Sequence, residues 1–425
     1  MCDERCTFVV PKKGRRCRMR ALAGHEYCGE HVLRCDLKNG EGHDRIICPL
    51  DATHTCSAAL LSKHLKKCNA KAKEAHEYFL RNINSGLPKP EGHQNPCKLF
   101  LKDVSDEELL AIIGKLERIC EALTDRPGTY VGLHEGLSAE LDGLVDCAVA
   151  QKHLRQKAAL LGLAESQGLL DGQACYIEFG AGRGRLSYWL AKILSGKGCR
   201  FLLVDRASSR HKFENKIRRE EQDNSSEIQR LQIDIEHLCL GKVGLVKAHQ
   251  GHLVGLCKHL CGEATDFAIR CLVETAGKTS DSSSAASALQ GLLMAVCCHH
   301  RCRWSSFVGR PFLEQAGVSE RDFELLTCLA GWATCAAREA RSNVQANKDD
   351  LSEPPALAVN RYVRMNLSIE RREEIGRRCK LLLDIARIRC LATAGLDARL
   401  VYFVDRDVTP ENVAIVALPR KSTPC

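Results

Sequence analysis

Four cysteine and histidine residues in the segment 48–68 have the types and spacing of metal ligands. They are Cys48, His54, His64 and Cys68. His64 and Cys68 lie four residues apart in an expected helix over 60–68, and this spacing places both donors on one helical face. With Cys48 and His54 in the preceding turn, they predict a tetrahedral Cys2His2 zinc site. Cys56 is a spare thiol that does not share that helical face.

A second set of four donors precedes the first. It consists of Cys6, Cys17, Cys28 and His31. Cys28 and His31 form a local clip, whereas the long spacers between the other ligands make the pattern looser, so Cys2 and Cys35 remain alternative ligands. In both sets, four protein ligands leave no open position for water or substrate. We therefore expect two structural zinc ions and no zinc chemistry.

The amino-terminal region is also the most basic part of the chain. The formal net charge is +9, and residues 1–70 contain 13 Lys and Arg against 8 Asp and Glu. Six cations lie between the ligands of the upstream set: Lys12, Lys13, Arg15, Arg16, Arg18 and Arg20. An ordered segment of this kind forms a loop that contacts phosphates, and the alternative is an ordinary solvated face. The charge favours a polyanionic partner.

The 25 cysteines bear on the cellular compartment. Eight of them lie in the first 68 residues, and no apolar stretch follows a basic start there as in a secretory signal. We therefore expect an intracellular protein, nuclear or cytoplasmic, whose other thiols are small buried side chains. No run reaches the roughly 18 to 20 apolar residues of a membrane helix. We expect no membrane partner.

A glycine-rich turn follows an apolar segment in the middle of the chain. Its glycines are Gly180, Gly182 and Gly184. They stand between an expected strand over 175–179 and an expected helix over 186–194, where glycines let the backbone approach a nucleotide closely. Asp205 follows the next strand, at the place where an acidic residue binds the ribose of NAD or of S-adenosylmethionine. Glu178 favours S-adenosylmethionine, because a carboxylate repels a pyrophosphate but tolerates a cationic methionine moiety.

Short apolar segments alternate with helical patterns in the second half of the chain. The expected strands span 175–179, 201–204, 231–235, 253–257 and 292–297. This alternation predicts right-handed βαβ units and a parallel sheet with helices on both faces. Segments 400–404 and 413–417 flank a turn that contains Asp407 and Pro410, and they predict a closing hairpin. The expected fold class is α/β, a Rossmann-like sheet with that hairpin.

The flanking segments differ from this core in composition. Residues 1–70 show little apolar periodicity, which is typical of small modules that fold around a metal. Residues 71–171 show helical periodicity and predict a helical bridge into the main domain. The segments 277–288, dense in Ser and Ala, and 341–355, polar and ending in two prolines, predict surface loops.

Six motifs in order along the chain are similar to those of one family. They are Cys48–Asp51 with His54 and His64–Cys68, then Lys152–Leu154, Glu178–Gly182, Ile233–Leu238, Lys258–Gly262 and Cys297–Cys302. The chain resembles the eukaryotic tRNA 2'-O-methyltransferases that modify nucleotide 4 of the acceptor stem. That layout implies a CCCH finger at 1–35, a CHHC finger at 45–70, the bridge at 71–171, and a class I methyltransferase domain at 172–425. The family has lysines where this chain has Arg183 and Arg185, a change that preserves charge.

This resemblance implies methyl transfer from S-adenosylmethionine to a ribose 2'-hydroxyl of tRNA, and we expect no DNA partner. The donor site is expected to contain Glu178 and the three glycines around the methionine moiety. Asp205 is expected at the donor ribose, and Asp234 on the adenine side.

The acceptor site is expected beyond the carboxyl ends of the fourth and fifth strands. A ribose hydroxyl is a poor nucleophile, so it must be positioned in line with the methyl group and must lose its proton. We expect Lys258 or His259 near this hydroxyl. His299, His300 and Arg301 are expected to orient the ribose or a phosphate.

Other interpretations remain open at this stage. One is a non-catalytic zinc-finger scaffold that binds RNA or is associated with splicing, and another is an NAD-linked oxidoreductase. A third metal site within Cys297–Cys302 is disfavoured, because consecutive strand residues point to opposite faces of a sheet.

Overall fold

The computed structural model divides the chain into two compact units, residues 1–75 and residues 76–425. It describes residues 5–10, 15–17, 19–21, 24–28, 31–32, 45–68, 76–87, 99–144, 147–207, 209, 212–220, 227–277, 288–335 and 361–420. Several expectations concern residues outside this description: the loop at 341–355, most of that at 277–288, Cys2, Cys35, and the side chains of Lys12, Lys13, Arg15 and Arg18.

The smaller unit contains two β-ribbons and one helix among its described residues. The ribbons pair β1 (Val9–Val10) with β2 (Arg15–Arg16) and β3 (Arg45–Cys48) with β4 (Asp51–Ser57), and both pairs are antiparallel. The helix α2 (Leu61–Lys67) lies where the sequence predicted it. Its last residue is followed directly by Cys68, so the helix positions that thiol as well as His64.

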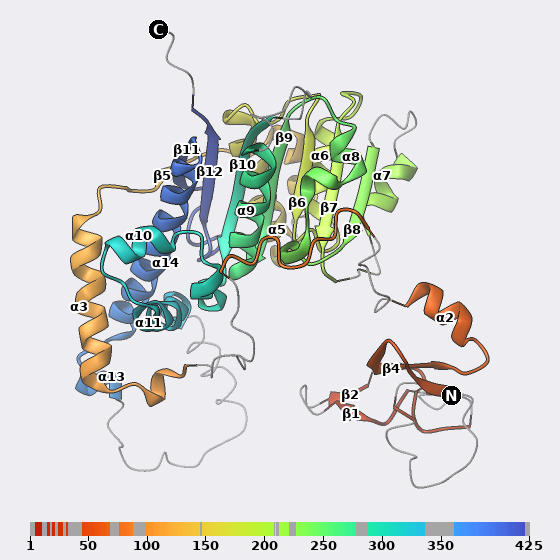
Figure 1. The fold of residues 1–425 in the computed structure, drawn as a ribbon, viewed down its shortest axis with the longest axis horizontal. Helices are drawn as coiled ribbons and strands as arrows, with labels where there is room; N and C mark the ends of the chain where they lie inside the picture. The colour runs from red at the N-terminus through yellow and green to blue at the C-terminus, as the bar shows by residue number, and fades with distance from the viewer. Residues whose placement is uncertain are drawn as a thin grey trace. The chain divides into compact units, whose positions relative to one another are not determined.

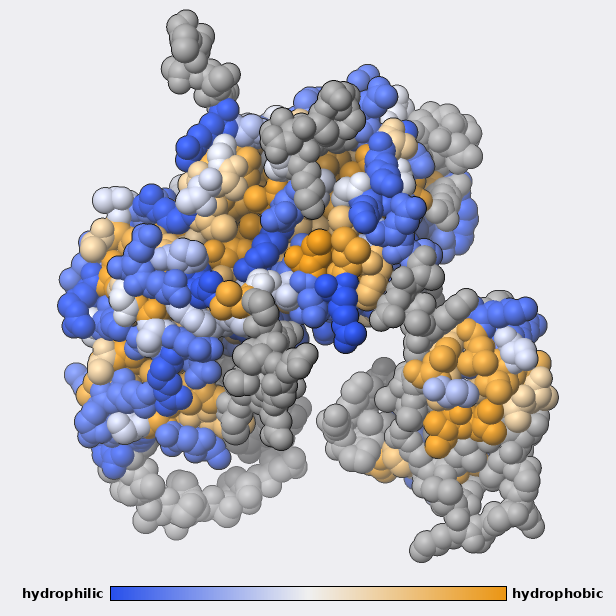
Figure 2. Space-filling model, viewed as in Figure 1, coloured by the Kyte–Doolittle hydropathy of each residue, from blue (hydrophilic) through white to orange (hydrophobic). Residues whose placement is uncertain are grey.

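The described part of this unit buries little apolar surface. One cluster consists of the thiols of Cys6, Cys17 and Cys28 with Phe8 and Tyr27 packed against them, and the other buried apolar residues are Val32, Cys48, Cys56 and Cys68. Figure 2 shows apolar residues gathered on the visible face of the unit, and the exposed large side chains include Ile47, Leu50 and Leu60. A module with so small a core depends on metal ligation for its stability.

The larger unit is built on an eight-stranded sheet with the strand order β5-β11-β12-β10-β9-β6-β7-β8. Its strands are β5 (Gly128–Thr129), β6 (Cys175–Phe179), β7 (Arg200–Asp205), β8 (Glu227–Gln232), β9 (Leu253–Cys261), β10 (Leu289–Cys297), β11 (Leu396–Tyr402) and β12 (Val413–Pro419). Neighbouring strands from β10 to β8 are parallel, and the hairpin of β11 and β12 pairs antiparallel with β10. The predicted α/β fold with a closing hairpin is confirmed (Figure 1).

The strand β8 is shifted from its expected position. Apolar patterning predicted a strand over 231–235, whereas Ile235–His237 forms a short 3-10 helix, η4. Asp234 explains why the strand ends earlier, because its carboxylate accepts a hydrogen bond from the backbone N–H of Glu236 and caps that helix.

Helices cover both faces of this sheet (Figure 1). One face packs against α5 (Ala148–Ser166), α6 (Arg185–Ile193) and α7 (Glu214–Glu220), and the other against α9 (Glu263–Gly277) and α14 (Ile369–Thr393). Along β6, Cys175, Ile177 and Phe179 belong to the core with α9, and Tyr176 belongs to the core with α5 and α6. This alternation buries both faces of the parallel strands, as their continuous apolar sequences predict.

A helical extension has a third core of its own. It contains α3 (Asp106–Ala122), α10 (Arg310–Gln315), α11 (Glu320–Ala330) and the amino-terminal part of α14. The segment expected as a helical bridge, residues 71–171, therefore belongs to two parts of the larger unit. Its helix α3 packs on α11 and α14 in the helical extension, whereas α5 packs on the sheet. Within the described residues, no helix combines the length and the apolar character needed to cross a membrane.

A buried ionic network joins α14 to α9 and to the turn after β10. The guanidinium of Arg387 contacts both carboxylate oxygens of Asp266 at 2.8 and 3.1 Å and donates to Asp384 at 3.0 Å. Asp384 also lies 2.9 Å from Nε2 of His299. Arg387 and Asp384 are 1% exposed and Asp266 is fully buried. Removing one partner would leave uncompensated charge in the interior.

We therefore expect Arg387→Met to lower the free energy of unfolding by roughly 3–5 kcal/mol, the cost of breaking a buried ion pair. Urea unfolding followed by circular dichroism measures this change. Arg389→Met is a matched control on the same helix, because Arg389 pairs with Asp125 at the surface, where ion pairs contribute about 0–1 kcal/mol. Similar losses in both variants would show that the Arg387 network adds no particular stability.

Candidate functional site

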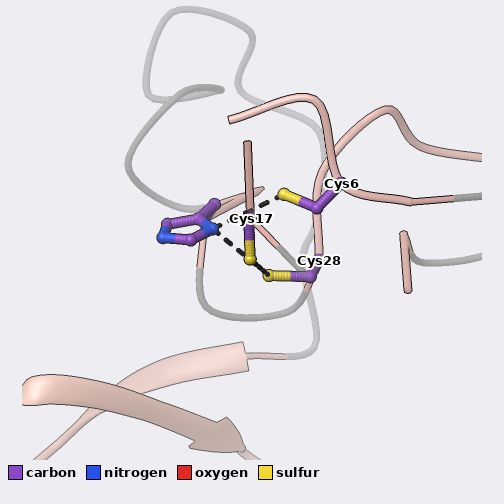
Figure 3. Close-up of side chains that lie close together, drawn as sticks. Cys6, Cys17 and Cys28 are labelled. Carbon is purple, nitrogen blue, oxygen red and sulfur yellow. Dashed lines mark hydrogen bonds between the residues drawn. The ribbon is translucent and has the colours of Figure 1, made fainter. Parts of the chain in front are cut away.

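The upstream ligand set forms one cluster in the smaller unit. The ligand atoms of Cys6, Cys17, Cys28 and His31 all lie within 4.8 Å of one another. Nδ1 of His31 is 3.5 Å from Sγ of Cys6 and 3.3 Å from Sγ of Cys28, and the sulfurs of Cys17 and Cys28 are 3.9 Å apart (Figure 3). The Phe8 ring stacks on the imidazole at 3.9 Å. Three thiols and one imidazole at these separations fit a tetrahedral zinc ion.

The second cluster contains Cys48, His64 and Cys68. The two sulfurs are 3.6 Å apart, and Nε2 of His64 lies 3.1 Å from Sγ of Cys48. His54 belongs to β4, but its side chain lies outside the described residues. Cys56 is buried on β4, opposite Ile46. Among the described side chains it does not belong to this cluster, which agrees with its interpretation as a spare thiol.

The glycine turn connects β6 to α6 in the larger unit. Gly180, Gly182 and Gly184 all have positive φ, between 52° and 76°. At Gly184 a Cβ would lie 2.8 Å from Leu203 and 3.0 Å from the Arg230 guanidinium, so this position needs a glycine for space as well as for conformation. At Gly182 a Cβ would meet no atom within 4 Å, so open space adjoins the turn there.

The backbone of Gly182 is held from two sides. Its N–H donates to Oδ2 of Asp205 at 2.7 Å, and the other oxygen of Asp205 accepts from the N–H of Ala207 at 2.7 Å. Its carbonyl accepts from Nη1 of Arg230 and from the Ser209 hydroxyl, each at 2.9 Å. The turn is therefore tied to the ends of β7 and β8 before any ligand binds.

Arg230 and Glu214 form the ion pair behind this turn. Their contacts are bidentate, at 2.5 and 2.9 Å, and the two side chains are only 9% and 4% exposed. Neither residue was predicted from the sequence. Arg230 lies just before the strand expected over 231–235, and nothing in the spacing linked it to a glutamate 16 residues earlier.

Glu178 is buried at the end of β6. One of its oxygens accepts hydrogen bonds from the backbone N–H and the hydroxyl of Ser187. Burial raises the pKa of Glu178 to about 7, although the Ser187 donors and the Arg230 charge act in the opposite direction. Its charge therefore changes near neutral pH, unlike that of an ordinary glutamate.

Asp205 is the last residue of β7, and Asp234 lies two residues after the adjacent strand β8. Both are partly exposed, and the backbone N–H of Ile233 donates to the carbonyl of Asp205 at 3.0 Å, which keeps the two turns together. One oxygen of Asp234 caps η4 by accepting from Glu236 at 3.2 Å. Two carboxylates thus lie at one edge of the sheet, beside the glycine turn.

Lys258 and His259 lie near the end of β9, next to the same turn. Nζ of Lys258 is 2.7 Å from Nε2 of His259, and His259 has a positive φ of 67°. Burial lowers the pKa of Lys258 to about 8. Partial burial and the Lys258 charge lower the pKa of His259 to about 4, so the imidazole is neutral at pH 7 and accepts a hydrogen bond from the ammonium.

The helix α5 adds cations that the sequence analysis did not assign. Lys157 is buried, and its ammonium donates to the carbonyl of His153 at 2.7 Å. Burial, together with the charges of Lys258 and Arg185, lowers the pKa of Lys157 to about 8, whereas Glu178 opposes the shift. A lysine among the apolar positions of a helix was the signal for this residue.

The residues of the turn after β10 point in different directions. His299 is buried and its Nε2 faces Asp384, while its Nδ1 has no hydrogen-bond partner among the described residues. His300 and Arg301 are exposed. The backbone of Arg301 packs against Gly262 of the turn after β9. His299 therefore belongs to the ionic network of α14, whereas Arg301 lies against the turn that follows β9.

A pocket of about 500 Å³ adjoins His299 at this end of the sheet. Residues of β11, β12 and α14 line it together with Val296. Its lining includes four cations (Arg377, Arg378, Lys380 and Arg406) and four carboxylates (Glu374, Asp384, Asp405 and Glu411). Equal numbers of opposite charges do not favour phosphate binding in this pocket.

Both units of the chain are similar to known protein families. The methyltransferase family described as "Methyltransferase TRM13" matches residues 155–418. A "CCCH zinc finger in TRM13 protein" matches residues 4–32, and a "U11-48K-like CHHC zinc finger" matches residues 45–69. The two clusters of the smaller unit thus lie within zinc fingers of recognised types.

Full-length relatives give the same result. The mouse "tRNA:m(4)X modification enzyme TRM13 homolog" is 35% identical, with 98% of this chain and 95% of the relative aligned. The human protein of that name is 34% identical, with 99% and 96% aligned. The TRM13 protein of Yarrowia lipolytica is 29% identical, with 97% and 89% aligned. These matches confirm the resemblance drawn from the motifs, and the chain belongs to the TRM13 family of methyltransferases, with amino-terminal CCCH and CHHC zinc fingers.

Proposed function

We propose that this protein transfers the methyl group of S-adenosylmethionine to the ribose 2'-hydroxyl of nucleotide 4 in the acceptor stem of tRNA. The relatives that align with nearly the whole chain are named for tRNA modification at m(4)X. The observation that carries the proposal is the glycine turn, which is fixed by Asp205 and Arg230 beside the buried Lys157 of α5 and the partly buried Lys258 of β9.

The side chains around the turn fit a methyl donor. The open space at Gly182 gives room for the ligand, and each oxygen of Asp205 accepts one N–H, which leaves lone pairs for ribose hydroxyls. Asp234 would lie on the adenine side. Glu178 would face the ammonium of the methionine moiety, with Gly180 and Gly184 shaping the turn. The donor supplies an activated methyl group, and the protein supplies position and charge.

The acceptor hydroxyl would lie at the end of β9. Lys258 is held there by its contact with His259, and its lowered pKa makes a neutral amine available near pH 8 to accept the hydroxyl proton. His259, neutral at pH 7, would fix the direction of the Lys258 side chain. Arg301 and His300 are exposed and would contact the phosphate or ribose, and His299 would position this turn through Asp384.

The tRNA backbone would approach over the first part of α5 and the glycine turn. Lys152 and His153 on α5, and Arg183 and Arg185 at the turn, are exposed. The guanidinium carbons of Arg183 and Arg185 both lie 5.4 Å from the centre of the Phe213 ring, so this ring holds the two side chains close together. The positive charges of Lys152, Lys258 and Arg185 all act on His153, so the cations converge on one surface. Such convergence is typical of phosphate contacts.

The reaction itself is tested with two synthetic tRNA acceptors. We expect the purified protein to methylate a transcript that carries ribose at nucleotide 4, and to leave a matched transcript with 2'-deoxyribose at that nucleotide unmodified. Nuclease mapping of radiolabelled methyl groups measures both. Equal labelling of the two transcripts would contradict 2'-O-methylation, and binding of tRNA without labelling of either would favour the scaffold interpretation.

The raised pKa of Glu178 predicts a pH dependence of donor binding. Only the ionised carboxylate attracts the donor ammonium, and its population falls as the pH drops through about 7. We expect the affinity for S-adenosylhomocysteine, measured by calorimetry, to fall roughly tenfold between about pH 8 and pH 6. The Glu178→Gln variant should bind more weakly at pH 8 and lose this pH dependence. An unchanged pH profile in the variant would assign the dependence to another group.

Replacement of Lys258 tests the acceptor side. We expect Lys258→Met to slow single-turnover methyl transfer by roughly 100-fold or more, the usual contribution of a positioned acid or base, while donor affinity changes little. Methionine keeps the unbranched apolar stem, so packing is largely preserved. Lys247→Met serves as the control, because Lys247 forms an exposed ion pair with Glu77. Near-normal rates in the Lys258 variant would exclude it from proton handling.

A further inference from the structure

Three thiols meet at the carboxyl ends of β9 and β10, outside the two fingers. Sγ atoms of Cys261, Cys297 and Cys298 all lie within 4.8 Å of one another, and those of Cys261 and Cys297 are 3.8 Å apart. We propose that Cys261, Cys297 and Cys298 bind a zinc ion, in addition to the ions of the two amino-terminal fingers. This inference concerns the larger unit alone and does not rest on the proposed reaction.

The sulfur separations support a metal at this place. A zinc–sulfur bond of about 2.3 Å with tetrahedral angles places two sulfurs about 3.8 Å apart. The Cys261–Cys297 separation equals that distance, and it lies between those of the finger pairs Cys17–Cys28 at 3.9 Å and Cys48–Cys68 at 3.6 Å. The sulfurs of Cys261 and Cys297 are thus as close to each other as the ligand sulfurs of the two zinc fingers.

The backbone is bent at two points to bring these thiols together. In the pairing of β9 with β10, the register shifts at His259, which has a left-handed φ, and Cys261 then lies opposite Cys297. Cys298 is also left-handed, with φ 52° and ψ 40°. Residues other than glycine rarely adopt this conformation. It also breaks the strand alternation, so that two consecutive cysteines reach the same partner.

From sequence, a third metal site within Cys297–Cys302 was disfavoured because of that alternation, and the conformation of Cys298 removes this argument. The proposed ligands also differ from the set within Cys297–Cys302 that the sequence suggested. His299 and Cys302 instead join the network of α14, through Asp384 and Arg387. The third thiol comes from Cys261 on the neighbouring strand.

The turns that bear the cysteines are packed directly on each other. Gly262 follows Cys261 with φ 62°, and a Cβ there would lie 2.5 Å from Cβ and 2.6 Å from the carbonyl oxygen of Arg301. Only glycine allows this approach of the two backbones. Contact between the turns keeps Cys261 beside Cys298 without any disulfide.

The charge and exposure of the cluster also suit an ion. Three thiolates around Zn²⁺ carry a net charge of −1, and the cations of Arg301 and Lys258 act on Cys261 and Cys297, respectively. Cys261 and Cys298 are partly exposed, so an ion has access, and Cys297 is buried. Three protein ligands leave one coordination position for water or another small ligand.

The test measures zinc bound to the full-length protein, purified under reducing conditions and dialysed, by inductively coupled plasma mass spectrometry. We expect one zinc ion per chain more than the two fingers bind. Cys298→Ser and Cys261→Ser should each lose one ion, and so should the finger variant Cys48→Ser. Cys147→Ser, at an exposed thiol outside every cluster of the described residues, should lose none. Only two ions in the wild type, with no loss in Cys298→Ser, would overturn the proposal.

A second measurement uses the unsubstituted protein, so that a folding defect in a variant does not decide the result. N-ethylmaleimide is added with and without a zinc chelator, and labelled peptides are identified by mass spectrometry. We expect Cys261 and Cys298 to be protected until the chelator is added, whereas Cys147 reacts at once. Immediate labelling of Cys261 and Cys298, or a disulfide between Cys261 and either neighbour, would overturn the proposal. Methyl transfer is assayed separately, so a failure of the proposed reaction is distinguishable from a failure of the zinc proposal.

Discussion

The donor side of the site depends on how the backbone of Gly182 is held. Asp205 accepts its N–H, and Arg230, fixed by Glu214, donates to its carbonyl. These bonds join the turn after β6 to β7 and β8, two neighbouring strands whose carboxyl ends lie at the same edge as that of β6 because the pairing is parallel. Without them a turn with three left-handed glycines would sample many conformations. Burial of this ion pair costs desolvation free energy, and its structural effect is to hold the glycine turn in one conformation.

Several ionisable side chains lie at the same edge of the sheet, in surroundings that disfavour their charged forms. Lys157 and Lys258 are driven toward their neutral forms by burial, and Glu178 is driven toward its protonated form. Buried ionisable groups with opposite tendencies, close to one turn, are more typical of a catalytic site than of a structural one. The Arg387 network provides the contrast within this protein, because each of its charges has a direct partner at about 3 Å.

Sequence patterning predicted the sheet and its hairpin because apolar runs and glycine turns are local signals. It placed β6 at its observed bounds and located α2 between the finger ligands. It did not identify α14, whose apolar residues face the sheet on one side and the helical extension on another, so no single helical stripe appears. It misplaced β8 because the capping role of Asp234 is invisible in the hydrophobic pattern.

The site shows a similar division. Residues directly beside a motif, such as Asp205 and Lys258, were identified, whereas Glu214, Arg230 and Lys157 act through contacts between distant segments. His299 was expected at the acceptor, but its ring belongs to a buried pair with Asp384 that no spacing rule reveals. The assignments to donor and acceptor remain predictions.

The thiol clusters differ in what a metal contributes to each unit. The described part of the smaller unit buries mainly cysteine thiols and few larger apolar side chains, so the metal supplies folding energy there. The larger unit has three apolar cores and does not need an ion to fold. An ion bound by Cys261, Cys297 and Cys298 would instead fix the local conformation of two turns, at a point three residues after Lys258. Its loss should therefore disturb the acceptor side of the site while leaving the fold, and the glycine turn two strands away from β10, largely intact.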